Sequence, residues 1–138
     1  MGMKNENNKA SSARLVLYSD GIVGLTFGMI LLLAGSLLGA LTGLPEGILK
    51  YAGLIVLPVG LFMLFAGFVA PRISLIALIV LVNAAWIAGS GLLLLVGLPL
   101  TAFGYFFVIS QALVVVFFTV LEWREVQKLK RPSLARAH

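Results

Sequence analysis

Four long apolar segments, separated by short breaks of turn-forming and polar residues, constrain the fold of this chain more than any other feature. A helix needs about 20 apolar residues to cross a hydrocarbon layer of about 30 Å. The segments are apolar on every side instead of alternating in polarity, which favours helices over the strands of a membrane β-barrel. We therefore predict an all-α membrane fold, a bundle of four transmembrane helices over residues 21–41, 49–70, 74–96 and 101–121.

The amino-acid composition also indicates a membrane protein. Of the 138 residues, 61% are hydrophobic and 11% are charged, whereas soluble domains are roughly 45–50% apolar and about 25% charged. A small soluble domain buries only about two-thirds of its chain surface, so it has no means of shielding so much apolar surface. We expect a polar basic segment (1–14), one transmembrane domain (15–121) that is retained and not cleaved as a signal peptide, and a basic tail (122–138) that extends the last helix to Arg131.

The Lys and Arg residues predict the orientation. Nine of them fall on the side of the two termini, and Lys50 alone falls on the other side. Because cytoplasmic loops are enriched in Lys and Arg, we expect both termini in the cytoplasm, in a membrane such as the bacterial inner membrane. The expected partners are membrane lipids, with anionic headgroups at the basic ends, and further copies or a larger membrane complex. The net charge of +5 lies at the ends and does not favour nucleic-acid binding.

The chain also repeats itself. Residues 34–45 (AGSLLGALTGLP) and 88–99 (AGSGLLLLVGLP) share eight of twelve residues at a constant offset of 54. This pattern predicts two helical hairpins in a parallel repeat, related by a pseudo-twofold axis along the membrane normal. The alternative is a coincidence between two Gly-Leu-Pro turns.

Glycines mark candidate packing surfaces, since small residues let helix backbones approach closely in a membrane. Those of the second segment are seven residues apart, a period that keeps one seam toward a partner. The partner helix could belong to the same chain or to another copy. The candidate packing residues are Gly24, Gly28, Gly35, Gly39, Gly53, Gly60 and Gly67.

Polar residues within the apolar segments are the candidate intramembrane site. Asn83, Gln111 and Pro58 fall at similar depth, and Pro58 frees the carbonyl of Leu54, which must be satisfied internally. We expect the Asn83 or Gln111 amide to reach that region, and Trp86 to wall a small apolar cavity. The alternative is purely structural hydrogen bonding between helices. The candidate polar residues are Asn83, Gln111, Ser110, Trp86, Ser90 and Pro58.

Asp20 and Arg14 are the candidate ionisable residues. Asp20 is the acid closest to a span interior, and ionisable groups within spans are functional candidates by default. It could instead begin the first helix as its N-cap, or pair with Arg14 or Arg72. Glu122 is expected to be an interfacial charge paired with Arg124 or Arg72.

Motifs for chemistry are missing from the sequence. It has no Cys, one terminal His (His138), no Gly-x-Ser-x-Gly elbow and no P-loop. We therefore expect no enzyme activity and no catalytic, cofactor or metal-binding residues.

Two resemblances involve specific motifs. The Gly-Leu-Pro turn, the Asn83-x2-Trp86-x3-Ser90 stretch and the Leu100-Thr101-x2-Gly104 entry resemble small bacterial four-helix membrane proteins of unknown function, over roughly residues 17–124. Arg14-x3-Tyr18-Ser19-Asp20 resembles the Arg-x3-Phe-Ser-Asp motif of bacterial and lysosomal potassium channels. This chain has Tyr in place of Phe and four spans where that family has a six-helix unit.

Three functions remain open from the sequence. The first expectation is a non-enzymatic accessory subunit or helix-packing scaffold, which the glycine seams favour. The second is a small transporter or channel for an ion or small molecule, which the polar residues and the repeat favour. The third is a binder of a lipid or another hydrophobic ligand beside Trp86.

Overall fold

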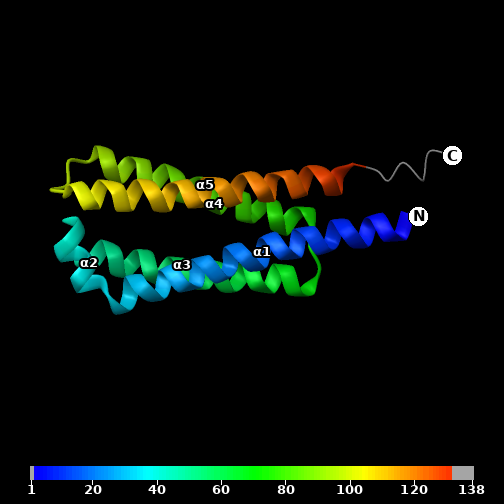
Figure 1. Cartoon of the computed structure of the whole chain (residues 1–138), viewed down its shortest axis with the longest axis horizontal. Helices are drawn as coiled ribbons and strands as arrows, with labels where there is room; N and C mark the ends of the chain where they lie inside the picture. The colour runs from blue at the N-terminus through cyan, green and yellow to red at the C-terminus, as the bar shows by residue number, and fades with distance from the viewer. Residues whose placement is uncertain (1, 132–138) are drawn as a thin grey trace.

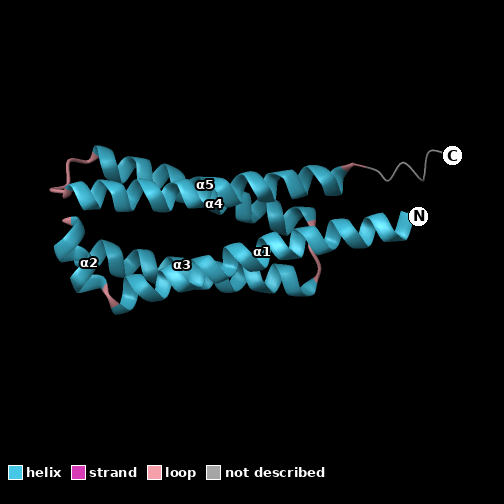
Figure 2. Cartoon of the chain, viewed as in Figure 1, coloured by secondary structure: helices cyan, strands magenta, loops and turns pink. Residues whose placement is uncertain are grey.

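Helices are the only regular secondary structure in the part of the chain that the structure, a computed structural model, describes, residues 2–131 (Figure 2). Four of the five helices are long and apolar enough to cross a membrane, which confirms the predicted all-α fold with four apolar spans. The helices are α1 (Gly2–Leu33), α2 (Gly35–Thr42), α3 (Glu46–Val69), α4 (Ile73–Leu95) and α5 (Ala102–Lys130).

The helices form two hairpins. In the first hairpin α1 packs against α3, and in the second α4 packs against α5. Helix α1 also contacts α5. Helices α3 and α4, in contrast, barely touch. Helices α1 and α4 run in the same direction (Figure 1), as the parallel repeat predicts. The start of α1 and the end of α5 lie at one end of the bundle, called the termini end below, and α2 lies at the opposite, loop end.

The repeated Gly-Leu-Pro turns each contain a glycine with a left-handed backbone conformation. Gly43 follows α2 with φ of 75°, and Gly97 follows α4 with φ of 74°. This left-handed conformation is open to glycine and costly for other residues, and the proline that comes two residues later favours an extended chain before the next helix. The turns therefore support the predicted repeat.

The glycine seam joins α1 and α3 within the chain. A Cβ at Gly60 would lie 3.0 Å from the Gly21 carbonyl oxygen, and one at Gly53 would lie 3.0 Å from that of Gly28. Gly67 lies against the ring of Tyr18. A Cβ at any of the other candidate packing glycines would also have neighbours from the same chain within 4 Å, and these glycines are Gly24, Gly35 and Gly39.

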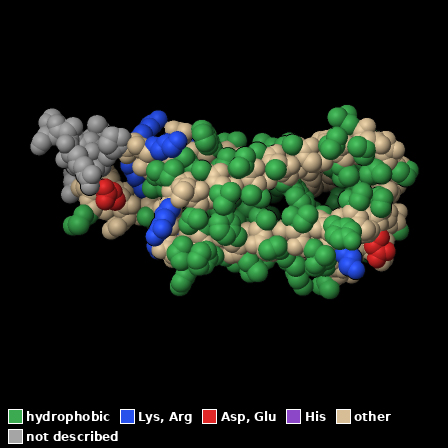
Figure 3. Space-filling view, turned by 180° about the vertical axis from the view of Figure 1, so that it is seen from behind, with side chains coloured by type: hydrophobic (Ala, Val, Ile, Leu, Met, Phe, Trp, Pro, Cys, Tyr) green, Lys and Arg blue, Asp and Glu red, His purple; other side chains and the backbone are tan. Residues whose placement is uncertain are grey.

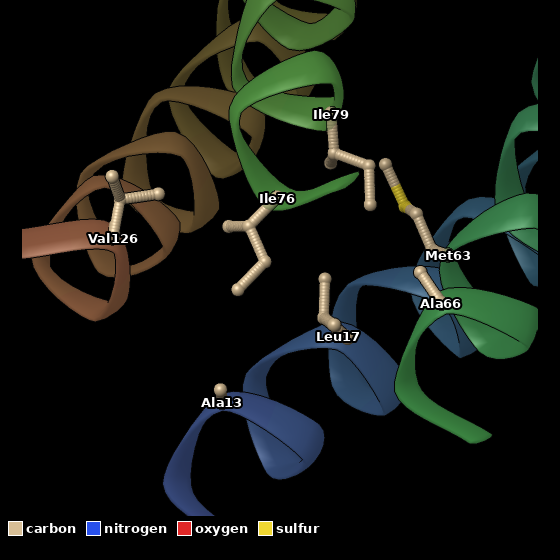
Figure 4. Packing of buried hydrophobic residues seen from close by; sticks show 7 residues of the cluster. All are labelled: Ala13, Leu17, Met63, Ala66, Ile76, Ile79 and Val126. Atoms are coloured by element: carbon tan, nitrogen blue, oxygen red, sulfur yellow. The ribbon is translucent and has the colours of Figure 1, made fainter. Parts of the chain in front are cut away.

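The termini end is closed by a hydrophobic core to which all four long helices contribute (Figure 4). Met63 and Ile79 lie close to each other in this core, with Leu17 and Ile76 nearer the terminus of α1. Outside the core, the surface between the two ends is largely hydrophobic, and charged side chains gather toward the ends on the face seen in Figure 3. This distribution fits a shaft surrounded by lipid. The core residues are Ala13, Leu17, Met63, Ala66, Ile76, Ile79 and Val126.

At the loop end, the loop of the first hairpin contacts the loop of the second hairpin. The Thr101 backbone N–H donates to the Thr42 carbonyl over 2.9 Å, and its hydroxyl donates to the Leu41 carbonyl over 2.6 Å. Gly104 packs so closely against the Thr42 carbonyl that a Cβ there would clash with its oxygen. The hairpins are thus attached at both ends and less closely packed between them.

The expected start of the first helix is wrong. Asp20 is not an N-cap, because α1 begins at Gly2 and passes through Asp20 without interruption. Residues 2–14 contain no proline and continue the helix, and Ala13 packs into the core. The expected polar segment is therefore the first part of α1, while α5 extends to Lys130 as expected for the tail.

Candidate functional site

Two carboxyl groups and one amide meet in the interior where α1, α4 and α5 approach one another. The Asn83 side-chain nitrogen Nδ2 donates to Asp20 Oδ2 over 3.1 Å and to Glu122 Oε2 over 2.9 Å. The three residues are buried, with 5%, 6% and 0% of their surfaces exposed. We call Asp20 and Glu122 the acid pair.

The positions follow from helix periodicity. Residues three or four apart lie on the same face of a helix, and each polar residue is one turn from a core residue on its own helix. Asp20 follows Leu17, and Asn83 follows Ile79. Glu122 precedes Val126 by one turn, so the same faces that build the core also bring the acids together.

Because Asn83 Nδ2 donates to both carboxyl groups, Asp20 Oδ2 and Glu122 Oε2 lie close to each other. Two ionised carboxylates in such a position repel each other, so a proton or another cation beside them would be stabilised. The ion pair found within residues 2–131 is Lys128 with Glu125, over 2.6 Å, and it does not include the acid pair. Among the described residues the acid pair is therefore held by the Asn83 amide, without a basic side chain.

A third acid lies one turn further toward the termini end. Glu125 is buried, and its Oε1 accepts from the Ser12 hydroxyl over 2.9 Å as well as from Lys128. Glu125 Oε2 and Glu122 Oε1 are buried and have no hydrogen-bond partner among the described residues. Such unsatisfied acceptors are costly and mark a place where a proton or another donor would be stabilised.

A cavity of about 190 Å³, the acid cavity, lies between the hairpins beside the acid pair. Asp20 and Asn83 form part of its wall, and Trp86 and Gln111 form another part. Most of the remaining lining is aliphatic, with one aromatic ring from Phe27. Figure 3 shows a hollow between the hairpins, away from the termini end.

A second cavity of about 420 Å³, the loop-end cavity, continues toward α2. It is lined by Leu44 and Ile48 near the loops and shares residues with the acid cavity. The two spaces therefore adjoin along the bundle axis. The shared lining residues are Phe27, Ile55, Val82, Trp86 and Gln111.

A second polar cluster separates the two cavities. The Trp86 indole N–H donates to Gln111 Oε1 over 2.7 Å, and Gln111 Nε2 donates to the Ser90 hydroxyl over 2.9 Å. Ser90 in turn donates to the Trp86 carbonyl over 2.9 Å. The expected cavity beside Trp86 is present, with the indole held by its partner on α5.

The predicted single polar cluster around Pro58 is wrong. The Asn83 and Gln111 amides bond elsewhere and make no hydrogen bond to Leu54 within residues 2–131, and Pro58 lines neither of the two cavities. Ser110 donates to the Phe107 carbonyl on its own helix. Asn83, Gln111 and Pro58 lie at similar depth in their helices, but their side chains point in different directions around the helix axes and therefore have different neighbours.

The expected ionic partners are also wrong. Asp20 is bound by Asn83 and not by Arg14, which is exposed and makes no ion pair or hydrogen bond among the described residues. Glu122 is buried and does not pair with Arg124 or Arg72. Glu122 and Glu125 are interior residues that were not expected from the sequence, although their spacing of three places them on one face of the expected helical tail.

The donor set limits the chemistry. Within residues 2–131 no three His, Cys, Asp or Glu side chains form a group that could hold a metal ion, and His138 lies outside the described residues. What the site can do is bind and transfer a proton, or hold an organic cation. Comparison with protein-family models, curated proteins and solved structures finds no match.

Proposed function

We propose that this chain is a small membrane transporter whose acid pair, Asp20 and Glu122, binds a proton or cation beside an intramembrane cavity. The observation that carries the proposal is the Asn83 amide, which holds two buried carboxyl groups from different hairpins. Ionisable groups within spans are expensive and usually functional. A purely structural contact would need no acid here, since an amide or hydroxyl pair also bonds between helices.

The distribution of the site over both hairpins supports a transport cycle. Asp20 belongs to the first hairpin, whereas Asn83 and Glu122 belong to the second. Any movement of one hairpin against the other therefore changes the distance from Asp20 to both Asn83 and Glu122. Transporters built from repeats commonly place their binding site between the repeats and alternate access by such movements.

The orientation is part of the proposal. With both termini in the cytoplasm of a bacterial inner membrane, the acid pair lies on the cytoplasmic side of the hydrocarbon core, because α1 continues for about 20 Å from Asp20 to Leu33 at 1.5 Å per residue. The two cavities then extend from the acid pair toward the outer side. The pair would exchange protons with the cytoplasm and meet its cargo in the cavity.

The scaffold expectation has lost its main support, because the glycine seams pack within the chain. Homo-oligomer formation, a larger complex, binding of anionic headgroups and the resemblance to the channel motif stay predictions. A second candidate function, binding of a lipid or other hydrophobic ligand, is favoured by the apolar lining of the cavities beside Trp86. Native mass spectrometry of the purified protein would detect a retained lipid.

The test of transport is voltage-driven proton flux in liposomes that contain a pH-sensitive dye. The wild type should exceed protein-free liposomes several-fold, and Asp20→Asn and Glu122→Gln should each return the flux to background. Glu46→Gln is the matched control, because Glu46 is an exposed carboxyl at the loop end, bonded to Ser36. Wild-type flux at background, or unchanged flux in both acid variants, would reject the proposal.

A further inference from the structure

The acid cavity combines an apolar body with one negatively charged end, and this combination defines a ligand class. We propose that it binds a lipophilic monocation about the size of one aromatic ring with a small ammonium group. The ammonium lies beside Asp20, and the apolar body lies against Trp86 and Phe27. This inference rests on the proposed function in using the same acid pair.

Charge is the first argument. An acid pair with one proton carries one negative charge, and among residues 2–131 no basic side chain bonds to it. A buried charge without a counter-charge is strongly unfavourable. Glu122 Oε1 is fully buried and has no hydrogen-bond partner among the described residues, but Glu122 does not line the acid cavity, so Asp20 is the acid that a ligand in the cavity would meet. A ligand cation would supply the missing charge.

The lining excludes the simplest inorganic cations as well-matched ligands. Hard cations such as Ca²⁺ take six to eight oxygen ligands, and Mg²⁺ takes six. The acid cavity offers polar side chains from Asp20, Asn83 and Gln111, and the rest of its lining is apolar. An alkylammonium group with an apolar body loses little hydration on entering such a space, so it fits better than a metal ion.

Size and shape set the second limit. An apolar cavity of about 150 Å³ holds one benzene ring, and the acid cavity measures about 190 Å³. Trp86 and Phe27 contribute rings to its wall, and the face of an aromatic ring attracts a nearby cation. The indole is held in place by Gln111, so this wall is ordered before a ligand arrives.

Two residues that line the acid cavity are exposed on the outer surface of the bundle. Ile55 on α3 is 55% exposed, and Val114 on α5 is also exposed. Helices α3 and α4 make few contacts with each other. A lipophilic cation dissolved in the membrane can therefore reach the cavity without passing through the core at the termini end.

The test is calorimetric titration of the purified, detergent-solubilised full chain with benzyltrimethylammonium and with its neutral isostere neopentylbenzene. We expect saturable binding of the cation, at least tenfold weaker in Asp20→Asn, and weaker binding of the isostere to the wild type. Val82→Phe, which fills the boundary of both cavities, should abolish binding of both compounds. Glu46→Gln should bind like the wild type.

Thermal unfolding of each variant shows whether it is folded, and Glu122→Gln replaces Asp20→Asn if the latter does not fold. Equal affinity for the cation and the isostere, undiminished cation binding in the acid variant, or no cation binding to the wild type would each overturn the ligand class. Failure here with normal proton flux leaves the proposed transport standing. Binding with no flux leaves the cation site standing and removes transport.

Discussion

At the scale of single residues, one side chain organises the site. Both hydrogens of the Asn83 amide group are available as donors, and the Nδ2 atom bonds to an acid from each hairpin. The acids lie on the core faces of α1 and α5, and both are buried. Their burial thus depends on a donor supplied by a third helix.

Replacing this donor tests that dependence. We expect Asn83→Leu to lower the free energy of unfolding by about 1–3 kcal/mol, the cost of unsatisfied buried polar groups. Thermal or denaturant unfolding in detergent measures the change. Ser110→Ala is the control, since the Ser110 hydroxyl bonds to its own helix, and it should change stability by less than about 0.5 kcal/mol.

The loss of unfolding free energy caused by Asn83→Leu should be smaller in a Glu122→Gln background. The amide that this second substitution introduces at position 122 can itself donate a hydrogen bond to Asp20. Residues that share one network show such coupling in double-mutant cycles. Strictly additive changes would mean that Asn83 stabilises the bundle without acting through the acids.

At the scale of elements, the first hairpin is packed more closely than the second. The backbones of α1 and α3 meet at Gly21 and Gly60, and again at Gly28 and Gly53. The second hairpin has glycines on α4 that meet nothing within 4 Å, such as Gly91. The closely packed hairpin carries Asp20, and the other hairpin carries Asn83 and Glu122.

Two alanine substitutions separate packing from helix propensity. Gly60→Ala should destabilise by about 1–3 kcal/mol through overpacking, because its methyl group would meet the Gly21 oxygen and Leu25 at 3.0 Å. Gly91→Ala should be neutral or stabilise by up to about 1 kcal/mol, since alanine favours helices over glycine. If the two variants had the same unfolding midpoint, close packing of α1 against α3 at Gly60 would be contradicted.

At the scale of the whole molecule, the two hairpins are joined unevenly. An exact twofold relation would make the contact of α3 with α4 equal to that of α1 with α5, yet only the second pair packs well. The core closes the termini end, and Thr101 ties the loops together at the other end. The cavities lie in the space that remains between these attachments.

The loop-end attachment should be sensitive to a single methyl group. Gly104→Ala places a Cβ in collision with the Thr42 oxygen and should separate the loops, with a loss of stability above about 2 kcal/mol by the overpacking mechanism. Gly97→Ala is the control, because φ of 74° is strained for alanine but nothing lies within 4 Å. That strain should cost about 1–2 kcal/mol, and a larger loss there than in Gly104→Ala would contradict the attachment.

The orientation can be measured with single cysteines, because the chain has none of its own. In intact cells, a membrane-impermeant maleimide should label Lys50→Cys at the loop end and should not label Arg131→Cys until the cells are opened. Labelling in the reverse order would place both termini outside and move the acid pair to the outer side of the membrane.

The number of spans, the turns between them and the hairpin repeat could be predicted from the amino-acid sequence, because each depends on local properties. Twenty apolar residues must form a helix in lipid whatever their neighbours, and Gly43 and Gly97 end their helices through backbone freedom alone. Asn83, Trp86 and Asp20 stood out for the same local reason, since polar or large amphipathic residues are unusual in such segments.

Which polar groups meet became clear only from the folded bundle. Asp20 and Glu122 belong to helices at opposite ends of the sequence, and the rotation of each helix about its axis, set by packing of all four, brings both to Asn83. Glu122 resembled a charge at a water boundary because its sequence neighbours are charged. The N-terminal part of α1 lies beside that stretch of α5 and bonds to it through Ser12, so the acids that look exposed in the sequence are covered in the fold.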